Sequence, residues 1–192
     1  MSLRVLVVDC DAERAAGVVY ALTAAGYLVA SVLETGSNLY AKVRELQPDV
    51  IIIDMESPDR DILEDLRSIS RDDPRAIVMF CQDDANETIS AAVKAGVSAY
   101  VVDGLQPHRI RPILQTAVAR FQAYQELRRE LAETKNTLAE RKILERAKGI
   151  LMKQRGISED EAYQILRKSA MNRNKRIIEM AENLITAYEL LG

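Results

Sequence analysis

The chain has 192 residues, of which 48% are hydrophobic and 29% are charged, and its formal net charge is −3. This balance is typical of a globular protein, and no apolar run approaches the roughly 20 residues of a membrane-spanning helix. Two cysteines, Cys10 and Cys81, exclude a disulfide framework and a cysteine metal cluster, and the N-terminus has no signal-peptide pattern. We therefore expect a cytoplasmic protein with one ordinary domain and one small one.

The N-terminal part alternates short apolar segments with amphipathic helical ones. Continuous Val and Ile runs such as residues 50–53 suit strands that are buried on both faces of a parallel sheet. Strands are predicted at Leu3–Val8, Leu28–Val32, Val50–Ile53, Ala76–Phe80 and Ala99–Val102, and helices at Ala12–Ala25, Ser37–Leu46, Ile62–Ser70 and Asn86–Ala95. This order predicts an α/β fold, a five-stranded parallel doubly wound sheet whose site lies at the carboxyl ends of the strands.

Residues 113–148 contain neither Gly nor Pro, which predicts one long helix. Within it Leu127, Leu131 and Leu138, together with Tyr124 and Thr134, alternate at three- and four-residue spacing. That spacing is typical of a short coiled-coil seam. We favour a dimer seam at these leucines over the alternative, in which the stripe folds back on the helix's own domain.

The C-terminal part predicts a compact three-helix unit. Gly156 is expected to end the long helix, and Ser158 with Glu161 forms a capping box that starts the next one. Asn172 or Asn174 is expected to cap a last helix. The apolar stripes of these helices are expected to form the core of the unit.

Two carboxylates mark the predicted edge of the sheet. Asp9 ends the first strand and Asp54 ends the third, and Asp11 lies close to Asp9 in the sequence. Because parallel strands end at the same edge, these side chains are expected to lie close together. Clustered carboxylates can bind Mg²⁺ and offer a nucleophile for phosphoryl transfer.

Together with Pro58 four residues after Asp54 and Lys94-Ala95-Gly96 before the last strand, this arrangement resembles a response-regulator receiver domain over residues 1–120. The resemblance implies that Asp54 is the phospho-acceptor position and Asp9 a metal-ligand position. It also implies a backbone metal ligand at the carbonyl of Glu56. No cofactor is expected to be required, and Asp9, Asp11 and Asp54 are the residues that could hold a Mg²⁺ ion in this pocket.

Three positions depart from the receiver pattern. Cys10 replaces a second acidic residue, for which Asp11 can compensate, and Cys81 replaces the Ser or Thr that contacts the phosphoryl group. Asp103 replaces the Lys that pairs with the phosphoryl group, so a phosphate on Asp54 would meet added repulsion. These changes favour control by something other than phosphate. The crowded carboxylates could equally bind a cation or stay partly protonated.

Charge is distributed unevenly along the chain. Residues 141–176 contain eleven Lys or Arg and four Asp or Glu, a net +7, whereas residues 1–112 contain eleven and eighteen, a net −7. A small basic helical part joined to an acidic domain indicates a nucleic-acid-binding output under the control of that domain.

The basic part carries a specific sequence pattern. Ala147–Met152, Glu161–Tyr163, Leu166–Met171 and Ala181-Glu182 together resemble the ANTAR module over residues 125–192. This module is the RNA-binding output domain of transcription antiterminators, and the resemblance implies a leader RNA with paired hairpin loops as target. Tyr163 is assigned to the core. The residues expected at the RNA are Ala147, Lys148, Gly149, Arg167, Lys168, Asn172 and Arg173, the small ones because they permit close approach.

Over its whole length the chain is similar to the NasT-type regulators of nitrate and nitrite assimilation. The similarity rests on Glu56-Ser57-Pro58, residues 95–100 and Ala139-Glu140-Arg141-Lys142. It implies a NasS-type nitrate or nitrite sensor protein that holds the regulator inactive and releases it. Paired hairpins imply a homodimer in the active state.

The sequence thus predicts a non-enzymatic transcription antiterminator. A first alternative is an ANTAR response regulator that a histidine kinase activates at Asp54. A DNA-binding regulator of another class lacks support, because no helix-turn-helix with a polar recognition helix is evident. A phosphate-metabolising enzyme would need the missing Lys and Ser or Thr.

Overall fold

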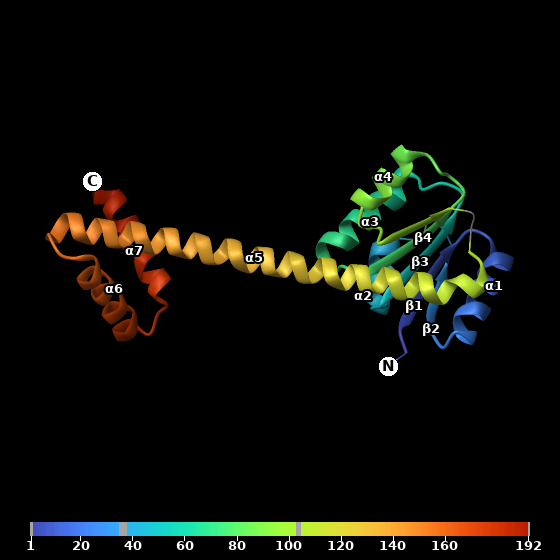
Figure 1. Ribbon diagram of the computed structural model, residues 1–192, viewed down its shortest axis with the longest axis horizontal. Helices are drawn as coiled ribbons and strands as arrows, with labels where there is room; N and C mark the ends of the chain where they lie inside the picture. The colour runs from blue at the N-terminus through green and yellow to red at the C-terminus, as the bar shows by residue number, and fades with distance from the viewer. Residues whose placement is uncertain (1, 35–37, 103–104, 192) are drawn as a thin grey trace. The chain divides into compact units, whose positions relative to one another are not determined.

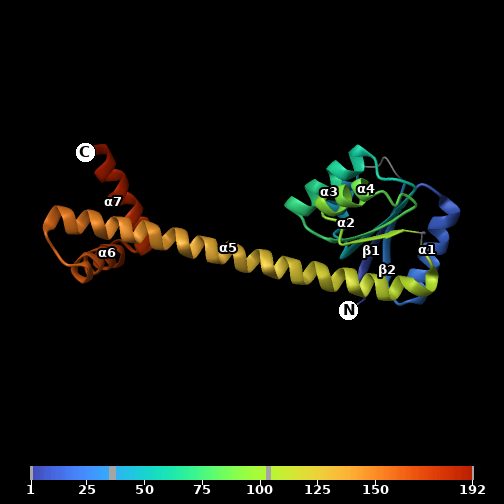
Figure 2. The ribbon, with the colours of Figure 1, turned by 45° about the horizontal axis from the view of Figure 1, so that its top comes forward.

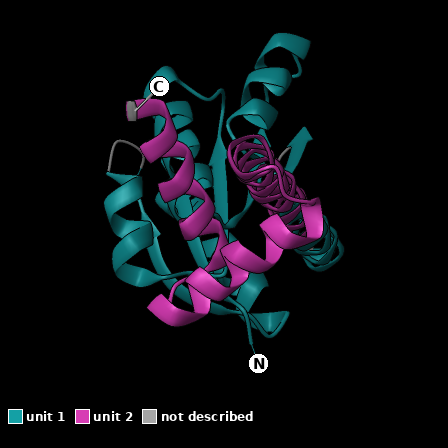
Figure 3. Cartoon of the chain, turned by 90° about the vertical axis from the view of Figure 1, so that its left-hand side faces the viewer, with its two compact units in different colours: residues 1–125 teal, residues 126–192 magenta. Residues whose placement is uncertain are grey.

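The structure of the protein, a computed structural model, describes residues 2–34, 38–102 and 105–191 (Figure 1). The chain divides into two compact units, Met1–Gln125 and Glu126–Gly192, which Figure 3 colours separately. Within the described ranges, no helix combines the length and the apolar character needed to cross a bilayer.

A five-stranded parallel sheet in the order β2-β1-β3-β4-β5 forms the centre of unit 1. This confirms the predicted fold class. The two strands β3 and β4 are buried along their whole length, as the apolar runs Val50–Ile53 and Ala76–Phe80 predict. The strands are β1 (Arg4–Asp9), β2 (Leu28–Leu33), β3 (Val50–Met55), β4 (Ala76–Cys81) and β5 (Ala99–Val102).

Helices cover both faces of this sheet (Figure 2). One face packs against α2 (Leu39–Leu46), α3 (Arg60–Asp72) and α4 (Asn86–Lys94). The other face packs against α1 (Ala12–Ala24) and the first turns of α5 (Ile110–Arg155). Successive strand residues point to opposite faces, so alternate residues of each strand fill two separate cores.

The turn after α4 shows how tightly these layers approach. Gly96 has a φ of +105°, and a Cβ placed on it would lie 2.5 Å from the Ser70 Oγ atom. Both the left-handed backbone and the space therefore require glycine here. The predicted end of this helix at Ala95 coincides with its C-cap.

The long helix α5 extends beyond its predicted bounds at both ends. It runs for 46 residues, through Pro112 near its start and Gly149 near its end. Proline is tolerated in the first turn because its missing N–H would have no intrahelical partner there. A helix-interior glycine costs only about 0.5–1 kcal/mol relative to Ala, and the buried Ile150 and Leu151 directly after it favour continuation. The helix stops before Gly156, which has a φ of +66°, as expected.

In unit 2 the end of α5 packs against α6 (Glu159–Arg173) and α7 (Ile177–Leu191). The predicted capping box of Ser158 and Glu161 is present at the start of α6. The prediction that Asn172 or Asn174 caps the last helix is wrong, because α6 continues through Asn172 and ends with Asn174 as its C-cap. Asn174 adopts a left-handed φ of 51°, which Asn tolerates better than most residues.

Candidate functional site

The carboxylates of Asp9 and Asp54 meet at the carboxyl edge of the sheet. They are direct register partners on the neighbouring strands β1 and β3. The two residues are only 3% and 4% exposed. Their place is the point where the strand order reverses, which is where ligands bind in sheets of this kind. The structure therefore brings this predicted pair together.

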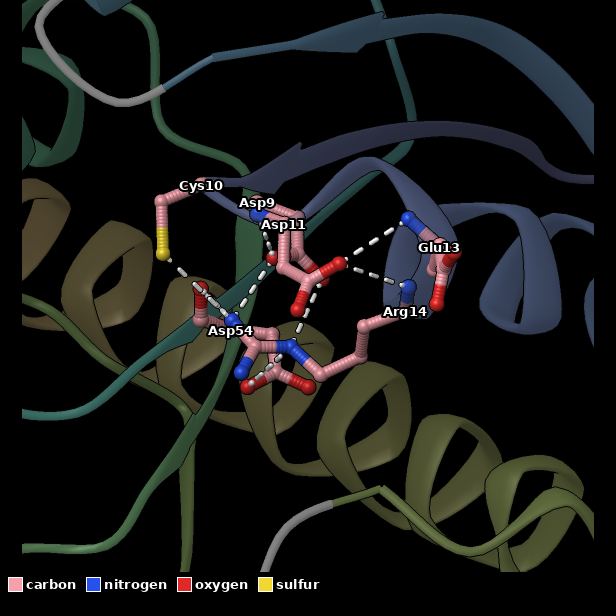
Figure 4. A network of polar contacts seen from close by, with 6 residues as sticks. All are labelled: Asp9, Cys10, Asp11, Glu13, Arg14 and Asp54. Atoms are coloured by element: carbon pink, nitrogen blue, oxygen red, sulfur yellow. Dashed lines mark hydrogen bonds and ion pairs between the residues drawn. The ribbon is translucent and has the colours of Figure 1, made fainter.

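Arg14, in the first turn of α1, lies between these two carboxylates (Figure 4). Its Nη2 and Nε atoms donate to the Oδ1 and Oδ2 atoms of Asp9 at 2.7 and 3.1 Å. Nε also lies 3.4 Å from the Asp54 Oδ1 atom. Sequence reasoning missed Arg14, although a basic residue one helical turn beyond an acidic strand end was the available signal.

The surroundings of Asp54 disfavour its ionised form. Burial raises the pKa of the Asp54 carboxyl, and the charges of Asp9 and Asp11 add to the shift while Arg14 opposes it. The Asp54 Oδ2 atom is buried and has no hydrogen-bond partner in the described part of the chain. The hydrogen bond to Asp9, in turn, raises the pKa of the Arg14 guanidinium, which therefore stays charged.

Two other expected metal ligands serve different purposes. Asp11 is the N-cap of α1, with its Oδ1 atom accepting hydrogen bonds from the backbone N–H groups of Glu13 and Arg14. The carbonyl of Glu56 accepts hydrogen bonds from the backbone N–H groups of Gln82 and Asp83, each at 3.1 Å.

Receiver domains typically bind Mg²⁺, but the residues of this pocket do not fit that ion. Among the residues that the structure describes, no three His, Cys, Asp or Glu side chains are arranged to hold a metal. This arrangement departs from the site considered in the sequence, because Asp9, Asp11 and Asp54 do not converge as three side-chain ligands. Its physical reason is that Asp11 caps a helix and an arginine fills the space between the other two carboxylates.

The remaining pocket positions are placed as follows. Cys81 is 1% exposed at the end of β4, and burial raises the pKa of its thiol, which stays protonated near neutral pH. Cys10 is exposed, with its Sγ atom 3.5 Å from the Arg14 Nη2 atom. Asp103 lies outside the described residues.

A polar cluster beside the pocket went unnoticed in the sequence. The Asp83 carboxylate accepts hydrogen bonds from the Ser57 and Thr88 hydroxyls at 2.8 and 2.9 Å and from the Ala85 N–H group at 2.9 Å. These bonds lower the pKa of Asp83. The cluster joins the loops that follow β3 and β4, so it fixes the rim of the pocket.

In unit 2, two residues expected at the RNA are buried. Ala147 is 0% exposed within the apolar core, which corrects the prediction that it lets RNA approach. The Lys148 side chain is 9% exposed, and its Nζ atom lies 2.7 Å from the Glu145 Oε1 atom and 2.6 Å from the Glu159 Oε1 atom. Lys148 thus pairs with one glutamate of α5 and with another at the start of α6, so its charge is not free in this structure, and its contact with RNA stays a prediction. Basic composition alone does not distinguish a buried, paired lysine from an exposed, unpaired one.

The outward face of α6 has a different character. Arg167, Lys168 and Arg173 are exposed, and none of them forms an ion pair with any described residue. Tyr163 and Met171 are 38% and 71% exposed, so the assignment of Tyr163 to the core is wrong. Tyr163, Arg167 and Met171 follow at four-residue spacing, which aligns them in one row along the helix.

The surface of α5 is open at Gly149. A Cβ placed there would have no described heavy atom within 4 Å beyond its own helix backbone. Lys142, Arg146 and Lys153 share this side of the helix because they lie three, four or seven residues from Gly149. Arg146 is paired with Glu189 at 2.5 Å.

The leucines of the expected seam are exposed. Leu127, Leu131 and Leu138 retain 62%, 53% and 54% of their accessible surface. Folding of the stripe onto its own unit, the alternative considered above, does not occur in this monomer. Gly149 and the seam are both features of unit 2.

Comparisons with known proteins agree with this anatomy. A family model described as the response regulator receiver domain matches residues 5–115, and one described as the ANTAR domain matches residues 132–185. The transcriptional regulatory protein PdtaR of Mycobacterium tuberculosis is 28% identical over 189 residues, or 98% of this chain and 91% of that protein.

Two further similarities cover one part of the chain each. The nitrate regulatory protein of Klebsiella oxytoca is 46% identical over 66 residues, which are 34% of this chain and 17% of that protein. The receiver domain of a modulated diguanylate cyclase from Desulfovibrio desulfuricans has a TM-score of 0.57 at 18% identity, over 65% of this chain and 99% of that one. The second similarity concerns the fold alone. The chain therefore belongs to the response regulator receiver family and, with its ANTAR match, is a receiver–ANTAR transcriptional regulator and not an enzyme.

Proposed function

We propose that this protein is a transcription antiterminator that binds a leader RNA with paired hairpin loops. The observation that carries the proposal is the outward face of α6 within the ANTAR match, where unpaired cations stand beside an exposed aromatic ring. Cations attract the RNA backbone, and aromatic rings stack on unpaired loop bases. The RNA-binding face is therefore assigned to Tyr163, Arg167, Lys168 and Met171, together with Asn172 and Arg173 at the C-terminal end of α6.

Gly149 supports a second point of contact on α5. It costs helix stability and relieves no steric contact within the chain, since its surroundings are open. A glycine without a packing reason on an exposed helix surface suits the close approach of a ligand backbone. Lys142 and Lys153 on the same side supply charge for an RNA phosphate.

The α6 face can be tested by separating charge from stacking. Removing two cations in Arg167→Ala with Lys168→Ala should weaken binding and reduce the slope of log K against log salt by about one unit per lost phosphate contact. Tyr163→Ala should weaken binding by about 1–3 kcal/mol and leave the salt slope unchanged. The measurement is filter binding of a two-hairpin leader RNA over a range of salt concentrations.

Matched controls exist for both arms of this experiment. Lys135→Ala with Arg141→Ala removes the same charge from exposed positions outside α6, and Tyr163→Phe keeps the ring. Binding of the Arg167→Ala/Lys168→Ala variant with wild-type affinity and salt slope would contradict the assignment of the α6 face.

The receiver is proposed to respond to a protein partner, a NasS-type nitrate or nitrite sensor that holds the regulator inactive. The similarity to the nitrate regulatory protein of Klebsiella oxytoca supports the nitrate context, although it covers only 17% of that protein. The pocket supports control by a protein over control by phosphate, because a buried, partly unsatisfied Asp54 is a poor place for further negative charge. Co-purification of the regulator with the sensor, and its loss on addition of nitrate or nitrite, tests this.

Phosphorylation of Asp54 by a histidine kinase is the second candidate. It is favoured by the position of Asp54 at the end of β3, in register with Asp9. Incubation with acetyl phosphate distinguishes the two: a stable acyl phosphate that increases RNA binding would favour the kinase, and an unchanged protein would favour the sensor.

A further inference from the structure

Two nearly fully buried carboxylates side by side require a counter-charge. The side chains of Asp9 and Asp54 are 0% and 6% exposed, and buried ions are costly unless they are paired. In a receiver pocket a divalent cation would be the expected counter-charge. In this chain Arg14 of α1 supplies a positive charge between the two carboxylates, while the Asp54 Oδ2 atom has no partner among the described residues.

The geometry of Arg14 is that of a ligand bridging both acids. Its planar guanidinium contacts both oxygens of Asp9, at 2.7 and 3.1 Å, the forked arrangement that arginine forms with carboxylates. The same group reaches Asp54 twice, at the Oδ1 atom (3.4 Å) and at the main-chain oxygen (3.5 Å) (Figure 4).

The position of Arg14 is itself fixed. Asp11 caps α1 by accepting hydrogen bonds from the backbone N–H groups of Glu13 and Arg14, which sets the start of the helix. Asp11, which could have compensated for the acidic residue missing at Cys10, therefore orients Arg14 instead. Compared with the receiver pattern, this chain has Cys10 in place of an acidic residue and the Arg14 guanidinium at the same site.

We propose that the Arg14 guanidinium is the resident cation of this pocket and takes the place of a divalent metal ion, so that Mg²⁺ is excluded from the Asp9–Asp54 pair. The pocket then fastens α1 to β1 and β3 in every state of the protein. A phosphoryl group on Asp54 would lack a bridging metal and would add negative charge beside Asp9. The role of Arg14 is independent of the identity of the RNA.

Mg²⁺ binding to the full-length chain tests this role. We expect calorimetric titration with millimolar Mg²⁺ to show no binding by the wild-type protein, whose unfolding midpoint should be equal in Mg²⁺ and in EDTA. Arg14→Met keeps the length of the side chain and removes its charge. This variant should bind Mg²⁺ at least about tenfold more tightly, which corresponds to about 1.4 kcal/mol. Adding Cys10→Asp to Arg14→Met should increase the affinity again.

A matched control removes an arginine elsewhere in the receiver. Arg60 is paired with Glu64 at 2.8 Å on the surface of α3, so Arg60→Met should leave the response to Mg²⁺ as in the wild type. The proposal is overturned if wild-type protein binds Mg²⁺ as tightly as folded Arg14→Met. If Arg14→Met does not fold, Mn²⁺ added to the wild type decides: selective NMR line broadening of amides at residues 9–11 and 54–56 overturns the proposal, and unbroadened lines uphold it.

Discussion

The exposed leucines of α5 lead to a quantitative prediction about self-association. Leu127, Leu131 and Leu138 keep 62%, 53% and 54% of their surface exposed in the monomer. Since full burial of a leucine is worth about 1.5–3 kcal/mol, burying the rest of each would contribute about 1–1.5 kcal/mol. Six leucines in a two-fold seam then give about 6–9 kcal/mol, against an association cost of about 4–15 kcal/mol. The seam should therefore support a weak, concentration-dependent dimer.

Leu131→Glu with Leu138→Glu removes four of these six leucines from the dimer. The loss of about 4–6 kcal/mol should raise the dissociation constant by about three to four orders of magnitude, at 1.4 kcal/mol for each tenfold change. Sedimentation velocity, with and without two-hairpin RNA, measures this. The wild type should bind the RNA as two copies per molecule, and the variant as one with lower affinity.

The matched control for this variant is Ala132→Glu with Ala139→Glu. It adds the same charges at the same seven-residue spacing, at exposed positions away from the leucine stripe. Wild-type self-association and RNA affinity in the Leu131→Glu/Leu138→Glu variant would refute the seam. Equal losses in both variants would attribute the effect to charge and not to the leucines.

Two further outcomes follow from single positions. Gly149→Ala should raise the helix stability of unit 2 by about 0.5–1 kcal/mol and yet weaken RNA binding, as measured by thermal unfolding and filter binding. Asp54→Asn should preserve readthrough of a leader-terminator reporter, and complete loss of induction at normal protein levels would instead favour phosphorylation. Burial raises the pKa of Asp54, so its ionised form opposes folding. At pH values above that pKa, Asp54→Asn should therefore have a higher unfolding midpoint than the wild type. The difference between the two midpoints should close as the pH falls through the pKa.

The fold and the pairing of Asp9 with Asp54 could be predicted because both depend on local pattern. Val and Ile runs define buried strands, and parallel strands that end with Asp must place those side chains at one edge. No comparable sequence pattern predicts the direction in which a long side chain points. Arg14 could extend into solvent or turn toward the sheet, and only the burial of two acids beside it determines which.

The same reason limited the prediction of the RNA-binding residues. Lys148 and Arg167 are equivalent in any count of charge, but Lys148 is held by Glu145 and Glu159 whereas Arg167 is unpaired. The sequence predicts Tyr163 in the core, whereas its side chain is 38% exposed. Its position on the outward side of α6 depends on how α6 is rotated against α5 and α7, which periodicity specifies only to within about a residue.

Available charge, and not total charge, determines what unit 2 can offer an RNA. Of the eleven Lys or Arg between residues 141 and 176, four form ion pairs with described residues, namely Arg146, Lys148, Lys175 and Arg176, and seven form none within the described part of the chain. Exposed pairs exchange partners at little cost, so three of the four can still be recruited by phosphate. Lys148 differs, because its side chain is nearly buried between Glu145 and Glu159, and releasing it would leave these two glutamates without their shared cation. The ion pair of Lys148 therefore favours RNA recognition by the neighbouring α6 face and α5 surface. In this arrangement Lys148 helps to position α6 relative to α5.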